Sequence, residues 1–114
     1  MSAKVQARFL KKDRTLQEIV RRIAAAYHPL RIYLFGSKAR GTAGPDSDYD
    51  LLVVVPDDAP AELKEGTLAY QRLWGIRKSK DVLVCTDEWF RSRSTVVTSL
   101  PATVKREGKL LYAA

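Results

Sequence analysis

Three short apolar runs constrain the fold of this chain more than any other feature of its sequence. They cover residues 31–35, 49–55 and 80–85, and the first is bounded by Pro29 and Gly36. Runs of this length, rich in β-branched and aromatic side chains, are typical of buried strands. Stretches with helical spacing lie before, between and after them. The sequence therefore predicts an α/β fold, with a mixed or largely parallel sheet flanked by helices.

The predicted helices differ in how clearly their ends are marked. Thr15 and Glu18 form a capping-box pattern at the start of a helix that runs to Tyr27, and its apolar positions recur at helical spacing. A second helix is expected between Asp57 and Gly75. Its expected buried stripe consists of Leu63, Thr67, Tyr70 and Trp74. Shorter helices and a short terminal strand are expected after the third apolar run.

Length and charge limit the classes of protein that fit. A chain of 114 residues has room for a single domain, residues 1–114, with a modest core. The net charge of +7 favours negatively charged partners, although nucleic acid is not favoured because no basic run is interleaved with aromatic residues. No stretch approaches the roughly 20 apolar residues that span a bilayer, so no membrane association and a cytoplasmic location are expected.

The residues after the first apolar run suggest a site for phosphate groups. Gly36 would end the strand and let the backbone approach a ligand closely, and Ser37 would add a hydroxyl donor at the start of a helical turn. Lys38 and Arg40 lie at the mouth of the following loop, where contact with triphosphate oxygens and plain solvation both fit. The sequence therefore predicts a nucleotide-binding site formed by Gly36, Ser37, Lys38 and Arg40.

Two aspartates lead into the second apolar run. Asp48 and Asp50 would point to the same face of a strand, because strand side chains alternate. Two carboxylates at such a short separation raise each other's pKa unless a cation lies between them. Their hard oxygen atoms favour Mg²⁺ or Mn²⁺. Asp81 would add a third carboxylate, enough for two ions. Asp87 and Glu88 are alternatives for this third position, although helix capping explains them more simply.

The spacing of these residues resembles a known signature. Gly36-Ser37, ten intervening residues, Asp48-Tyr49-Asp50 and a later acid on a strand resemble the DNA polymerase β-like nucleotidyltransferase superfamily. The chain is most similar to the minimal nucleotidyltransferase (MNT) branch, whose small proteins are often paired with a HEPN partner in toxin–antitoxin modules. The resemblance covers roughly residues 19–112 and is sharpest over residues 35–55. It implies the polymerase β-like fold.

The resemblance also implies an activity. Two Mg²⁺ ions, or Mn²⁺, would be held by Asp48, Asp50 and Asp81, and ATP or another NTP would be the nucleotide donor. The implied acceptor is a tyrosine or other hydroxyl on an all-helical HEPN toxin, which modification with AMP would silence, so the chain would be the antitoxin. Because the chain is short, the acceptor site would come from a partner or from a second copy in a homo-oligomer.

Two other functions are compatible with the sequence. The chain would be a catalytically inert subunit if it masked its partner by contact alone, but such a role does not require the acid trio. It would be an enzyme acting on a small hydroxylated molecule, such as an aminoglycoside, if it had an acidic acceptor cleft. Apart from the acids assigned to metal, the sequence shows no such acidic cluster.

Overall fold

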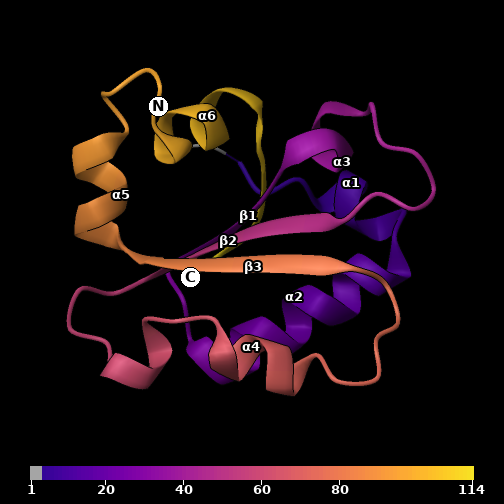
Figure 1. Ribbon diagram of the computed structural model, residues 1–114, viewed down its shortest axis with the longest axis horizontal. Coiled ribbons are helices and arrows are strands. Elements are labelled where there is room, and N and C mark those ends of the chain that lie inside the picture. The colour runs from indigo at the N-terminus through magenta and orange to yellow at the C-terminus, as the bar shows by residue number, and fades with distance from the viewer. Residues whose placement is uncertain (1–3) are drawn as a thin grey trace.

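The centre of the molecule is a mixed four-stranded sheet (Figure 1). The computed structural model describes residues 4–114, so the first three residues of the expected domain lie outside the described part. The strands are Arg31–Phe35 (β1), Tyr49–Val55 (β2), Lys80–Thr86 (β3) and Lys109–Ala113 (β4). Their order is β3-β2-β1-β4, with β1 antiparallel to β2 and β4, and β2 parallel to β3. The predicted mixed sheet is confirmed, and the largely parallel alternative is wrong.

Helices cover both faces of this sheet (Figure 1). They are Ala7–Lys11 (α1), Arg14–Tyr27 (α2), Gly36–Arg40 (α3), Thr67–Arg72 (α4), Asp87–Arg93 (α5) and Leu100–Glu107 (α6). α2 and α4 lie on one face, whereas α5 and α6 lie on the other, with α3 on their side at one end of the sheet. No helix within residues 4–114 has the length and apolar character needed to cross a membrane.

β2 divides the core into two layers. Leu51, Val53 and Val55 pack in the layer of α2 and α4, and Leu52 and Val54 pack in the layer of α5 and α6. All five side chains are at most 1% exposed. Burial of such a side chain contributes about 1.5–3 kcal/mol. A shift of the strand by one residue would exchange the two layers, so the packing of β2 fixes the direction of the acids at its start.

The start of α2 differs from the prediction. Asp13, not Thr15, is the N-cap residue, because its Oδ1 accepts a hydrogen bond of 3.0 Å from the backbone N–H of Leu16. Glu18 does not turn back to complete a capping box and instead pairs with Arg21 and Arg22, three and four residues further along the helix. The preceding α1 was not predicted.

The segment between β2 and β3 departs most from the sequence expectation. The predicted long helix is interrupted at Gly66, leaving a short 3₁₀ helix at Ala61–Leu63 and α4. A Cβ built on Gly66 would lie 2.9 Å from the carbonyl oxygen of Val82, so the backbone here passes close to β3. The predicted buried stripe is also wrong, since Trp74 is 86% exposed and Tyr70 is 47% exposed. Ala69 and Leu73 supply the buried contacts instead.

Candidate active site

β1 ends at Phe35, and the site is built around the next residue, Gly36, which begins α3. Gly36 has a φ of +75°, a backbone conformation that residues other than glycine rarely adopt. A Cβ built on it would lie 2.3 Å from Oδ2 of Asp50 on β2. Asp50 is the register partner of Phe35, the last residue of β1. The carboxylate of Asp50 therefore packs directly against the turn that begins α3.

The predicted nucleotide-binding side chains lie on α3 and are accessible from this turn. Ser37 and Lys38 are half-buried, and Arg40 is exposed. The ammonium group of Lys38 lies 4.5 Å from the ring centroid of Tyr49, which holds the lysine beside the start of β2. Arg40 Nη1 lies 3.8 Å from Glu107 Oε2, and both side chains are largely exposed, so this pair adds little stability. Arg40 is thus placed by a weak contact only.

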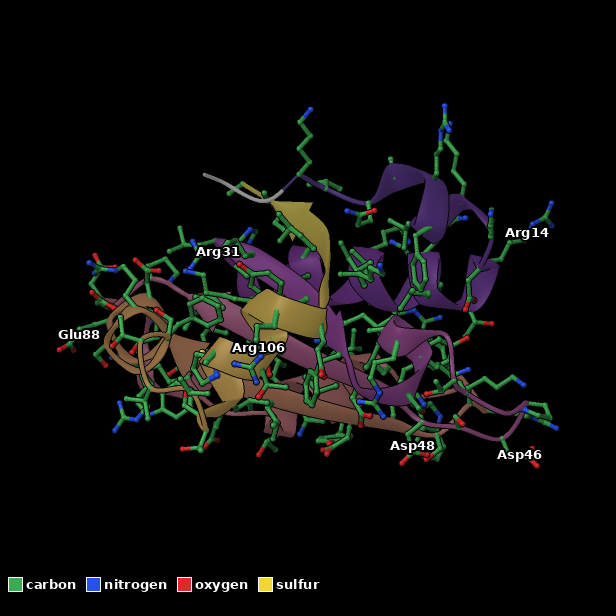
Figure 2. All side chains as sticks on the ribbon, turned by 90° about the horizontal axis from the view of Figure 1, so that it is seen from above. Arg14, Arg31, Asp46, Asp48, Glu88 and Arg106 are labelled. Atoms are coloured by element: carbon green, nitrogen blue, oxygen red, sulfur yellow. The ribbon has the colours of Figure 1, made fainter. Side chains whose placement is uncertain are left out.

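The three predicted acids gather at the same end of the sheet. Asp50 and Asp81 are register partners across the parallel strands β2 and β3, so their side chains point to the same face. Asp48 precedes β2 and is exposed, and Asp46 lies farther out on the same loop (Figure 2). Burial raises the pKa of Asp50, and the negative charges of Asp81 and Asp48 raise this pKa further, with Arg40 acting in the opposite direction. The charged form of Asp50 therefore lacks full compensation from the protein.

The chemistry of these donors fits a divalent cation that is bound together with a nucleotide. Among residues 4–114, no group of three His, Cys, Asp or Glu side chains is arranged by itself to hold a metal ion. However, Mg²⁺ in proteins is usually held by one or two carboxylates, substrate phosphates and water rather than by an all-protein cage. Asp50 and Asp81 supply adjacent carboxylates of this kind. The assignment of two ions to Asp48, Asp50 and Asp81 stays a prediction.

Tyr70 makes a contact at this site that the sequence did not indicate. Its hydroxyl donates to Oδ1 of Asp81 at 3.2 Å and accepts from the backbone N–H of Val82 at 3.0 Å. β3 is an edge strand, so N–H groups on its outer side need partners outside the sheet. Only the strand order reveals this need. The sequence pattern instead assigned Tyr70 to a buried helical stripe.

Asp87 and Glu88 lie far from this site. They begin α5 at the other end of β3, and Figure 2 shows Glu88 and Asp48 at opposite ends of the molecule. Asp87 Oδ1 accepts a hydrogen bond of 2.6 Å from Arg31, and its Oδ2 accepts one of 2.9 Å from Arg91. The alternative in which these acids replace Asp81 is therefore wrong.

The Gly36 turn lies beside carboxylates on two neighbouring strands. Carboxylates can hold the metal ions that assist phosphoryl transfer. The family comparison then names the class. Residues 14–110 match the model of the nucleotidyltransferase domain, and the chain belongs to this family. The resemblance inferred from the Gly-Ser and Asp-x-Asp motifs is confirmed. A comparison with curated proteins found no match.

Solved structures with the same fold include toxin–antitoxin proteins. A toxin–antitoxin structure with AMP-PNP is 27% identical, with a TM-score of 0.57 over 86% of this chain and 73% of the other. A proposed nucleotidyltransferase from Sulfolobus solfataricus is 25% identical, with a TM-score of 0.56 over 95% and 83%. A mutant of the toxin–antitoxin MntA-HpeT is 25% identical, with a TM-score of 0.54 over 83% and 71%. The toxin–antitoxin structures agree with the minimal branch of the superfamily.

Proposed function

We propose that this nucleotidyltransferase uses magnesium to transfer AMP from ATP to a hydroxyl group on a partner protein, as the antitoxin of a HEPN/MNT toxin–antitoxin pair. The position of Asp50 carries the proposal. The carboxylate of Asp50 contacts the Gly36 turn. Asp50 is also the register partner of Asp81 on the neighbouring strand β3. A triphosphate bound at the turn would therefore bring its α-phosphate next to two carboxylates. A binding role alone does not require this arrangement.

The residues of the turn bind the triphosphate in this proposal. The Gly36 backbone and the Ser37 hydroxyl hold the β- and γ-phosphates, and the absence of a Cβ at Gly36 lets both the phosphates and Asp50 approach. Lys38 and Arg40 offset the charge that develops on the departing pyrophosphate. The weak contact that holds Arg40 leaves its guanidinium group available to turn toward that charge.

The acids act on the side of the α-phosphate that faces away from the departing pyrophosphate. Asp48, Asp50 and Asp81 would hold divalent ions, which would neutralise phosphate charge and lower the pKa of the acceptor hydroxyl. Asp81 accepts the proton of the acceptor hydroxyl, because it lies nearest the open edge of the sheet. The acceptor oxygen forms a bond with the α-phosphorus, and the bond to the pyrophosphate breaks.

Support for a protein acceptor comes from the related structures. Two of them are toxin–antitoxin structures, one with AMP-PNP. We extend this pairing to the present chain and infer that its partner is an all-helical HEPN toxin whose tyrosine hydroxyl accepts AMP. Adenine is the inferred base because AMP-PNP is an adenine nucleotide.

The test is transfer within the native complex. The purified chain, its co-expressed partner and Mg²⁺ are incubated with each α-labelled NTP, and the partner is analysed by intact mass spectrometry. We expect label and mass on the partner with ATP, loss of both with Asp48→Asn and Asp50→Asn, and retention with Asp46→Asn, a matched change on the same loop. An unmodified partner that is nevertheless silenced equally by wild type and Asp50→Asn would show inhibition by contact alone and refute the proposal.

A further inference from the structure

The segment that leads from α4 into β3 displays an aromatic side chain on an ordered backbone. Trp74 is 86% exposed, the most exposed of the large apolar side chains among residues 4–114. Its backbone is nevertheless well held, because Arg22 Nη1 donates to the carbonyl oxygens of Arg72 at 3.2 Å and Trp74 at 3.0 Å. Lys80 Nζ donates to two further carbonyl oxygens in the segment, at 2.6 and 2.7 Å. The fold thus pays conformational entropy to present an indole ring to solvent.

This segment also borders a recess. The recess has a volume of about 480 Å³, and its walls include Tyr70, Trp74, Ile76, Arg77 and Lys80. Residues 67–80 contain four cationic side chains and no acidic one. The four cations are Arg72, Arg77, Lys78 and Lys80. Of these cations, Arg77 and Lys80 line the recess together with the exposed indole ring. Such a lining favours an occupant that combines negative charge with an apolar or aromatic group.

The recess is connected to the acid site through Tyr70. The ring of Tyr70 lines the recess, whereas its hydroxyl lies 3.2 Å from Oδ1 of Asp81. Lys80 lines the recess, whereas Asp81, the next residue on β3, points to the opposite face of the sheet. Figure 1 shows the α4–β3 segment at the same end of the sheet as α3 and the loop before β2. A chain bound in the recess would need to cross only the edge of β3 to reach Asp81.

We propose that this recess binds the acceptor: an acidic segment of the partner protein that docks on Trp74 and Arg77 and presents its hydroxyl group to Asp81. The inference rests on the proposed function, because it assigns the acceptor side of the same reaction. A protein segment is favoured over single-stranded nucleic acid by the number of aromatic contacts. Trp74 offers one largely exposed ring, and the ring of Tyr70 is half-exposed and anchored to β3 by its hydroxyl. Nucleic-acid grooves instead stack successive bases on several accessible rings.

The test uses labelled probes of defined charge. Fluorescence anisotropy compares three probes of equal length: a peptide with a tyrosine flanked by glutamates, one with lysines in place of the glutamates, and oligodeoxythymidylate. The variants are Trp74→Ala and Arg77→Glu. The matched exposed controls are Arg93→Glu, at the end of α5, and Val97→Ala, four residues later, because α5 lies at the opposite end of the sheet (Figure 1). Binding of a fluorescent ATP analogue with Mg²⁺ is measured separately on every variant.

We expect the acidic peptide to bind at least about tenfold more tightly than the basic one. Each recess variant should weaken binding of the acidic peptide about fivefold or more, whereas each control variant should weaken it less than about twofold. In the native complex, Trp74→Ala is expected to raise KM for the partner with kcat retained. Equal binding of both peptides, or binding that ignores Trp74→Ala, overturns the inference. Tighter oligonucleotide binding with the same sensitivity also overturns it. Absent nucleotide binding with intact acidic-peptide binding refutes the transferase activity while the docking recess stands.

Discussion

Replacement of Gly36 by alanine separates two effects that act on the same residue. The first effect is the left-handed backbone conformation, with φ at +75°. The second is a clash, because the new methyl group would lie 2.3 Å from Asp50 Oδ2. Gly41, at the other end of α3, provides a matched control. Its φ is +77°, but a Cβ built there has no heavy atom within 4 Å. Gly41→Ala therefore carries the backbone cost alone.

The expected magnitudes follow from this difference. The left-handed conformation costs an L-residue about 1–2 kcal/mol, which is the whole expected loss for Gly41→Ala. Gly36→Ala adds the displacement of a carboxylate that is partly buried, which corresponds to overpacking at about 1–3 kcal/mol. We therefore expect a total loss of about 2–5 kcal/mol for Gly36→Ala. At about 4 °C per kcal/mol for a domain of this size, the melting temperatures of the two variants should differ by about 4–12 °C.

Urea titration and thermal unfolding of both single variants measure these losses. The single variant Asp50→Ala and the double variant Gly36→Ala/Asp50→Ala complete a thermodynamic cycle. We expect the extra loss of Gly36→Ala largely to disappear in the Asp50→Ala background, because the carboxylate is gone. Equal losses for Gly36→Ala and Gly41→Ala, or an extra loss that persists in the Asp50→Ala background, would refute the close approach of Asp50 to the turn. Nucleotide binding should fall for Gly36→Ala far more than for Gly41→Ala.

Three further predictions concern charge, thiol chemistry and capping. The hydrogen bond from Arg31 lowers the pKa of Asp87. The ionised Asp87 therefore stabilises the fold above the ordinary carboxyl pKa, and this contribution is lost as the pH falls through the lowered value. Asp87→Asn should reduce the fall in the free energy of unfolding that urea titrations measure between pH 5 and 2, roughly the range in which carboxyl groups titrate. Burial raises the pKa of Cys85 to about 11, so iodoacetamide at about pH 8 should label the unfolded chain and spare the native one. Asp13→Ala should cost about 2 kcal/mol, because it removes both the cap of α2 and the acceptor of the Tyr49 hydroxyl; Asp13→Asn, which retains the capping oxygen, should cost less.

Local sequence patterns predicted the parts of the fold that depend on nearby residues. The runs at 31–35 and 49–55 form β1 and β2 with the predicted bounds. A short run of apolar side chains is most readily buried as a strand inside a sheet. The position of Gly36 between a strand and a helical turn was also predictable, since its role follows from its own backbone. Strand periodicity also predicted that Asp48 and Asp50 share one face of a strand, but only Asp50 lies within β2, and Asp48 precedes it.

Features that depend on the strand order were not predictable. The long helix expected at 57–75 failed at Gly66, where β3 passes too close for a side chain. The aromatic spacing of Tyr70 and Trp74 was read as core, although Tyr70 serves the edge of β3 and Trp74 faces solvent. Helical spacing identifies residues that share a side, but only the neighbouring elements decide whether that side is covered.

The candidate active site spans two strands that the chain joins by a long crossover, residues 56–79. A hairpin of β1 and β2 can pair through local contacts, but Asp50 meets Asp81 only after this crossover has closed. A fragment that ends within α4 would carry the glycine turn and two of the aspartates, yet it would have an incomplete acid face. Cleavage in the crossover, followed by separation of the two fragments, should therefore abolish the proposed transferase activity.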